Sequence, residues 1–316
     1  MQMQSTTTRT TRSTRTTRPS RTTRRIRPTA VLGAALSAAA LAASVAAAAP
    51  ASAAVDGGYH HAMANFAFPS TSGYAGGYVD CPAGRLPIAS GALSHDPMGI
   101  LMSNTLTTAG TGAYATASGS GGRAFTVQAD CVPASVLGGS TLATRVVRDR
   151  RNVWRDFRET VTCPSGTVAY GGGGTVTSPE GIYDHRGLYI SGSVPGVQGW
   201  TYAGTGSIGG NALVVEAHCL PRTRLGRIVV VDGAATATDG AGRLPISASA
   251  RCPVGTFPFS GGAWFRAEGS SVPGLVGYFT ASAMGADGRS WFAAGTTFAP
   301  RAQLITRVLC TDRLGR

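Results

Sequence analysis

Five histidines, a few carboxylates and a group of aromatic rings are the side chains that could do chemistry in this 316-residue chain. Two histidine–aspartate pairs stand out, because His95-Asp96 and Asp184-His185 fall at corresponding places in two repeated segments. With Glu180 nearby, they could build a hydrolytic or metal-binding site. Neither pair lies in a recognised zinc spacing or a nucleophile elbow. The sequence therefore favours polar loop residues at both places.

The other three histidines are His60, His61 and His218. The His60-His61 pair could bind a metal ion, but an exposed loop pair is the simpler interpretation. His218 directly precedes Cys219 in a segment of alternating apolar residues, so we expect a surface side chain on the face opposite the cysteine.

Four carboxylates could supply the acid pair of a glycosidase, whose members lie about 5 to 10 Å apart. They are Glu180, Asp184, Glu216 and Glu268. The sequence does not bring any two of them together. We therefore predict no catalytic residue, no bound metal and no cofactor.

Aromatic side chains are the better lead, because aromatic faces beside polar loops suit sugar rings. Tyr183 lies beside Asp184 and His185, and Trp200 follows in the same repeat. We expect these four residues to bind a ligand. For Trp200, and for Trp291 in the next repeat, the alternative is a place in the core.

All six cysteines belong to a block that occurs three times. Each copy has Cys-Pro-x-Gly, a glycine ten residues after the cysteine, and a second cysteine 50 to 58 residues on. The copies run over Cys81–Cys131, Cys163–Cys219 and Cys252–Cys310. An aromatic residue recurs 17 to 19 positions before the second cysteine, as Tyr114, Trp200 and Trp291. Because proline presets one dihedral angle and glycine is permissive, Cys-Pro-x-Gly predicts a turn.

Apolar residues alternate after each first cysteine and before each second one, which is typical of strands with one buried face. In the second copy, Val168 and Tyr170 show the pattern, as do Leu213 and Val215. No long helix is required, and residues 145–161 are the one stretch that fits either a helix or a strand.

The even number of cysteines predicts three disulfides. Two pairings respect the threefold pattern. We favour bridges within each copy, because each copy is then a complete module. The alternative joins neighbouring copies, for example Cys131 to Cys163.

The repeats predict an all-β fold of three units, residues 55–133, 134–221 and 222–316. A closed pseudo-threefold arrangement such as a β-prism, with one sheet per repeat, is favoured because no Pro/Ser/Gly-rich linker separates the units. Three tandem small β-sandwiches are the alternative, and a β-trefoil is a weaker third.

Three copies of Cys-Pro-x-Gly, an apolar strand, a glycine pair and a strand ending in cysteine resemble the vitelline membrane outer layer protein I family. The block is also similar to uncharacterised exported bacterial proteins with Cys-Pro-x-Gly repeats. The resemblance spans residues 79–310 and implies a β-prism, an extracellular role and association with carbohydrate. The chain departs from that family in its longer units and in Gly91-Ala92, where the second glycine of the pair is missing.

Residues 1–54 have the pattern of a secretory signal peptide. They carry eight arginines and no acid, then the apolar run Ala30–Ala49, then the cleavage pattern Ala51-x-Ala53. A membrane-anchoring helix is the alternative, which the weak hydrophobicity of the run disfavours. Arg24-Arg25 leaves twin-arginine export open beside the general route.

The net charge of +13 falls to about +5 once these eight arginines are removed, so nucleic acid is not indicated as a partner. An arginine cluster between Arg145 and Arg158 predicts a solvated charged face, or alternatively a patch for an anionic polymer. We expect a noncatalytic protein, secreted or at the cell surface, without a membrane span after signal cleavage, whose partner is an extracellular glycan or envelope polymer. An extracellular hydrolase that uses the mid-repeat histidines and carboxylates, and a purely structural surface protein, are the alternatives.

Overall fold

Strands joined by turns make up most of the part of the chain that the structure describes. The computed structural model describes residues 59–70, 73–107, 109–148, 153–177, 183–184, 188–238, 243–269 and 276–314. The expected signal peptide, residues 1–54, lies outside these ranges. Within them, no helix has the length and apolar character that a membrane crossing needs.

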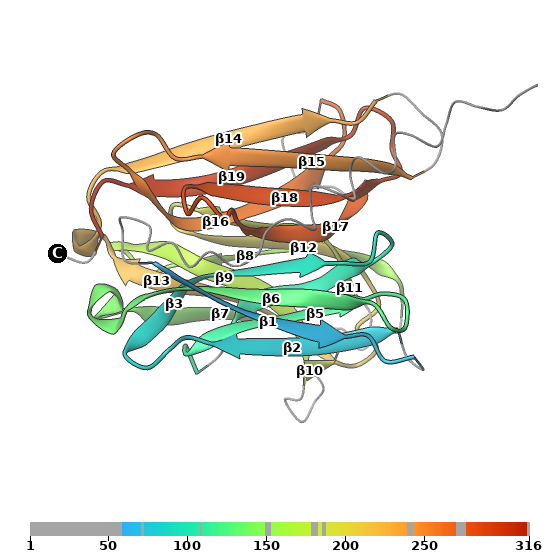
Figure 1. Cartoon of the computed structure of the whole chain (residues 1–316), viewed down its shortest axis with the longest axis horizontal. Helices are drawn as coiled ribbons and strands as arrows, with labels where there is room; N and C mark the ends of the chain where they lie inside the picture. Colours follow the sequence, from blue (N-terminus) through green and yellow to red (C-terminus); the bar gives the residue numbers. More distant parts are fainter. Residues whose placement is uncertain are drawn as a thin grey trace, which may run out of the picture. The chain divides into compact units, whose positions relative to one another are not determined.

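The described residues of each repeat supply six long strands (Figure 1). Repeat 1 contains β1 (His60–Ala67), β2 (Tyr74–Asp80), β3 (Arg85–Ser94), β4 (Ile100–Leu106), β5 (Gly112–Ser118) and β6 (Ala124–Pro133). Repeat 2 contains β7 (Thr141–Arg148), β8 (Arg155–Thr162), β9 (Thr167–Thr177), the short β10 (Tyr183–Asp184), β11 (Leu188–Gly196), β12 (Gly199–Gly206) and β13 (Ala212–Pro221). Repeat 3 contains β14 (Ile228–Thr236), β15 (Leu244–Arg251), β16 (Phe257–Arg266), β17 (Gly277–Met284), β18 (Ser290–Thr297) and β19 (Gln303–Thr311).

Two short 3-10 helices, η1 (Ala134–Leu137) and η2 (Arg222–Arg224), directly follow β6 and β13 at the junctions between repeats. The ambiguous stretch 145–161 forms the end of β7 and most of β8 in its described part, so it is strand.

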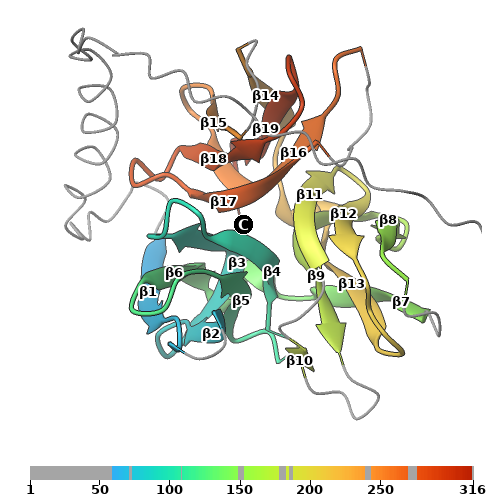
Figure 2. The ribbon, with the colours of Figure 1, turned by 90° about the vertical axis from the view of Figure 1, so that its right-hand side faces the viewer.

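The strands form three sheets, each shared by two repeats. Sheet A has the order β1-β6-β3-β17-β18-β15, sheet B has β2-β5-β4-β9-β13-β7 with β10 beside β9, and sheet C has β14-β19-β16-β11-β12-β8. In every sheet, the first, sixth and third strands of one repeat adjoin the fourth, fifth and second strands of another. This order confirms the closed pseudo-threefold prediction (Figure 2) and corrects the expectation of one sheet per repeat.

The glycine ten residues after each first cysteine explains why sheets can cross from repeat to repeat. Gly91, Gly173 and Gly262 lie where the third strand of one repeat meets the fourth strand of another. A Cβ at Gly173 would lie 1.8 Å from the backbone oxygen of Asn104, and one at Gly262 would lie 2.1 Å from that of Ser193. Any larger residue would push these strands apart.

The Cys-Pro-x-Gly turn and the disulfide of each repeat tie together two layers, which are the two sheets to which that repeat contributes strands. The turn glycines Gly84, Gly166 and Gly255 have φ of 78°, 79° and 79°, in the left-handed region that favours glycine. The bridges are Cys81–Cys131, Cys163–Cys219 and Cys252–Cys310, each with a Cα–Cα distance of 5.7 Å. The structure thus has the within-unit pairing. Each bridge joins the end of the second strand, in one sheet, to the sixth strand, in another.

The core lies between the layers, and its largest side chains are matched by glycines. A Cβ at Gly172 would lie 2.5 Å from the indole of Trp200, and one at Gly261 would lie 2.2 Å from that of Trp291. Both tryptophans lie on the fifth strand of their repeat, opposite the fourth residue after the β-bulge of the fourth strand. In repeat 1 the residue at that place is Ala113.

The sequence spacing that matches Tyr114 with Trp200 and Trp291 is therefore one residue out of register. It lies between the core residues Ala113 and Ala115, so it faces the other side of β5.

Candidate functional site

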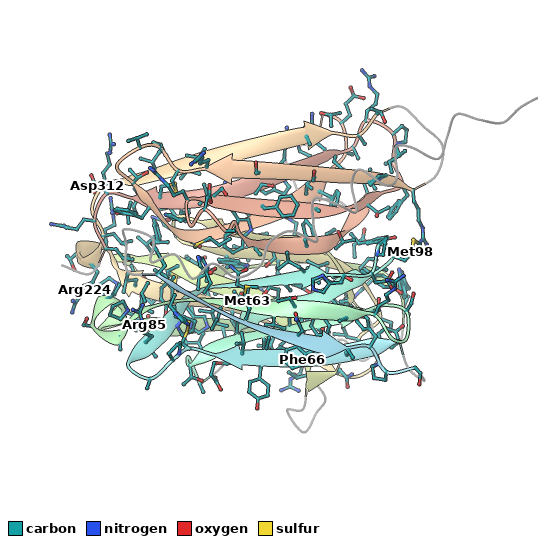
Figure 3. The ribbon with its side chains drawn as sticks, viewed as in Figure 1. Met63, Phe66, Arg85, Met98, Arg224 and Asp312 are labelled. Carbon is teal, nitrogen blue, oxygen red and sulfur yellow. A yellow bond between two sulfur atoms is a disulfide. The ribbon has the colours of Figure 1, made fainter. Side chains whose placement is uncertain are left out.

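Each sheet has an inner face in the core and an outer face. Met63 and Phe66 on β1 illustrate the two sides (Figure 3): Phe66 packs against Phe125 with ring centroids 5.6 Å apart, whereas Met63 is 52% exposed. Because the three sheets are equivalent, their outer faces can be compared position by position.

We define the central row of a sheet as the six outer residues, one per strand, in line with the glycine ten residues after the first cysteine. The central row of sheet A is Met63, Gln128, Gly91, Ala283, Phe292 and Ser249. The central row of sheet B is Thr144, Glu216, Gly173, Thr105, Tyr114 and Tyr78. The central row of sheet C is Asp232, Arg307, Gly262, Val194, Thr201 and Thr160.

The central row of sheet B is the one that combines a carboxyl, a hydroxyl and two phenol rings. The Thr105 hydroxyl donates to Glu216 Oε2 at 3.5 Å, which is long for a hydrogen bond. Burial raises the pKa of Glu216, and the hydrogen bond from Thr105 opposes that shift. Such a row offers donors, acceptors and ring faces side by side.

The row is shielded at its centre and open at its margins. Thr105, Glu216 and Tyr114 are 1%, 6% and 7% exposed, whereas Tyr78 on the edge strand β2 is 62% exposed. Thr144, at the opposite edge on β7, is also exposed. A ligand that reaches the centre would therefore also contact a margin.

Further polar groups flank the central row of sheet B. The hydroxyls of Ser103 and Thr116 lie 2.8 Å apart in the next row, and the buried Thr175 hydroxyl there has no hydrogen-bond partner within the described part of the chain. These hydroxyls add donors and acceptors beside Glu216.

His218 lies two residues from Glu216 on the same face of β13. It is 5% exposed, so the expectation of a surface side chain was wrong about its burial. Desolvation lowers its pKa to about 4, and its ring centroid lies 5.9 Å from that of Tyr170. At neutral pH it therefore brings a neutral ring, and no charge, to this face.

Two of the four ligand-binding residues expected from sequence fall in sheet B. β10 pairs Tyr183 with Thr177 and Asp184 with Val176 of β9, the strand that carries Gly173. The backbone therefore places both residues in the sheet of the central row, and their side chains lie outside the described set. His185 lies outside the described residues altogether.

Trp200, the fourth expected residue, is a core side chain. It is 5% exposed, and its indole nitrogen donates to the Ser193 hydroxyl at 3.0 Å. Trp291 repeats this arrangement, donating to Ser282 at 3.1 Å. Because Trp200 is enclosed between two layers, we do not keep it in the candidate site.

The His95-Asp96 pair has a structural role. The Asp96 carboxylate accepts from the backbone N–H of Met98 at 2.9 Å and of Ser120 at 2.5 Å. Burial acts to raise the pKa of Asp96, but these hydrogen bonds lower it below its ordinary value. His95 instead bonds the Thr126 hydroxyl at 2.7 Å, so the pair holds loops in place.

His61 does not form the exposed loop pair expected from the sequence. It lies on β1, and its Nδ1 is 2.6 Å from Oδ1 of the fully buried Asp130 on β6. Gln128 Nε2 donates to the same oxygen at 2.7 Å. The hydrogen bond with Asp130 raises the pKa of His61. Sequence reasoning missed Asp130 because nothing local shows which strand lies beside β6.

The other described carboxylates do not form an acid pair with Glu216. Glu268 follows β16 of sheet C and lies 3.4 Å from Arg301 at the surface. Within the described ranges, no three His, Cys, Asp or Glu side chains gather as metal ligands would.

The central row of sheet C is occupied by its own ion pair. Arg307 Nε lies 2.7 Å from Asp232 Oδ1, and its guanidinium carbon lies 5.0 Å from the centre of the Trp264 ring. No local pattern indicates this difference between sheets, because it depends on which strands meet. Tyr78 and Thr105 were missed for the same reason.

No protein-family model matches the chain, and no curated protein sequence matches it. The resemblance to the vitelline membrane outer layer protein I family therefore stays a prediction.

Proposed function

We propose that this chain is an exported, noncatalytic protein that binds a glycan or a related envelope polymer on the central row of sheet B. The observation that carries the proposal is the difference between equivalent rows. Where sheet A has Gln128 and Phe292, and sheet C has Arg307 and Thr201, sheet B has Glu216 and Tyr114.

The chemistry of the row matches that of a sugar. A pyranose ring has an apolar C–H face, which packs on aromatic rings, and a rim of hydroxyls, which pair with carboxyl and hydroxyl groups. Tyr78 and Tyr114 supply the rings, and Glu216 and Thr105 supply the polar partners. The carbohydrate association implied by the family resemblance agrees with this reading.

Export is supported by two features. The first 54 residues have the order of a secretory signal, and three disulfides are typical of chains that mature in an oxidising compartment. A hydrolytic function has less support, because Asp96 is held by backbone N–H groups and Glu268 by Arg301.

A retention assay on a panel of insoluble and soluble polysaccharides tests the proposal. Tyr78→Ala should weaken binding about five- to tenfold, since one exposed aromatic contact is lost. Glu216→Gln should weaken it further without changing the fold. The control is Met63→Ala, an exposed residue at the margin of sheet A that corresponds to Thr144 of sheet B, and it should bind like the wild type. Retention of no polysaccharide, or equal loss in the control, would contradict the proposal.

A further inference from the structure

We infer that the ligand is an extended, uncharged polysaccharide that lies across the six strands of sheet B and bridges repeats 1 and 2. This inference rests on the proposed function and adds the chain length, direction and charge class of the ligand.

The length of the site follows from the row itself. The central row of sheet B crosses six strands, so its ends are five strand spacings apart, or about 24 Å at about 4.8 Å per step. A single sugar covers only part of such a distance. Binding energy from both margins is therefore available only to a polymer.

Both margins offer exposed side chains of the kind that sugars contact. On β2, Tyr78 is 62% exposed. On β7, Leu142 and Val146 are 41% and 51% exposed, and they flank the exposed Thr144. These positions alternate along β7, so they share one face with Glu216 of the neighbouring β13.

The floor between the margins is smooth at its centre. Gly173 has no side chain, and a Cβ there would meet the backbone of Asn104 at 1.8 Å, so closure of the repeats keeps this position empty. The junction from β4 to β9 therefore has no side chain at its midpoint, between the shielded Thr105 and Glu216. The site is composite, because β2, β5 and β4 belong to repeat 1 and β9, β13 and β7 to repeat 2.

The charge of the row sets the class of polymer. The row contains the carboxyl of Glu216 and no basic residue, so a uronic acid polymer would find no counter-charge in it. On β7, Arg145 alternates with Thr144, so it lies on the opposite face, 2.6 Å from Glu159. The exposed Arg148 shares the face of Thr144 but lies four residues farther along the strand, outside the row. A neutral hexose or N-acetylhexosamine polymer fits this arrangement.

Calorimetric titration with a ladder of neutral oligosaccharides tests the inference. For the wild type, affinity should rise about tenfold or more with chain length until the oligomer spans the row, then level off. Tyr78→Ala and Val146→Ser should each flatten that rise, since each removes one margin. Met63→Ala should leave it unchanged.

The outcomes separate the inference from the proposed function. Binding of neutral sugars with no dependence on length overturns the inference and leaves the proposed function standing. Equal or tighter binding of a uronic acid oligomer of matched length also overturns it. Absence of all polysaccharide binding overturns both.

Discussion

The residue three places before each second cysteine shows how one scaffold position takes on different chemistry. It is Gln128 in sheet A, Glu216 in sheet B and Arg307 in sheet C. All three lie on an outer face beside the glycine of the central row, so backbone geometry does not distinguish them. What differs is the partner: Met284 O and Asp130 for Gln128, Thr105 for Glu216, and Asp232 for Arg307.

His218 should make the protein less stable in mild acid. Its folded pKa of about 4 lies below the ordinary value near 6.5, so protonation favours the unfolded chain between these limits. Stability from this group is present above pH 6.5 and is lost as the pH falls toward 4, by roughly 3 kcal/mol in total. His218→Leu, which copies Leu309 of repeat 3, should remove that loss. Urea unfolding at pH 4.5 and pH 8 measures the effect.

His61→Gln is the control with the opposite sign. The folded pKa of His61 is raised, so its contribution is present below pH 6.5 and is lost as the pH rises through the folded value. The variant should thus lose stability at pH 5.5 relative to pH 9. Identical pH profiles for both variants and the wild type would refute the assignment.

The third strand of each repeat has two structural roles. Its glycine in the central row admits the neighbouring repeat, and the residue just before it faces the fifth strand across the core. In repeats 2 and 3 that residue is Gly172 or Gly261 beneath a tryptophan. In repeat 1 it is Ser90, and the position of the tryptophan is taken by Ala113 rather than a large ring.

Gly261→Ala should destabilise the protein by about 1 to 3 kcal/mol, because the new Cβ would lie 2.2 Å from the Trp291 ring. Trp291→Ala alone should cost about 3 to 5 kcal/mol. The double variant should cost less than the sum, since the methyl group then has room. Chemical denaturation of the four proteins forms the cycle, and strict additivity would refute the pairing.

At the scale of the whole molecule, shared sheets make the repeats interdependent. Each repeat places three strands in each of two sheets, and the described residues all belong to one compact unit. No single repeat can complete a sheet alone. Unfolding should therefore be a single cooperative event.

Removing one disulfide should weaken the whole unit, not one repeat. Cys163→Ala with Cys219→Ala opens a bridge with a sequence separation of 56, for a loss of about 4 kcal/mol on the chain-entropy model. Because sheets B and C also hold strands of repeats 1 and 3, calorimetry should still show a single transition, at a lower temperature. Separate transitions for the repeats would indicate tandem domains instead.

The features that depend on local spacing could be predicted from the amino-acid sequence. Alternating apolar residues predicted strands such as β9 and β13, Cys-Pro-x-Gly predicted the turns, and the threefold register predicted the bridges and the closed arrangement. Each of these follows from neighbours along the chain. The register failed only at Tyr114, where repeat 1 is one residue out of step with the other two.

How the repeats share sheets, and which side chains meet, depends on contacts between distant parts of the chain. Glu216, Thr105 and Tyr78 come from two repeats and are up to 138 residues apart in the chain, yet the junction of β4 with β9 places them in one row. His61 and Asp130 meet for the same reason, across β1 and β6. Strand pairing between distant segments is set by the packing of the whole core, which no local pattern contains.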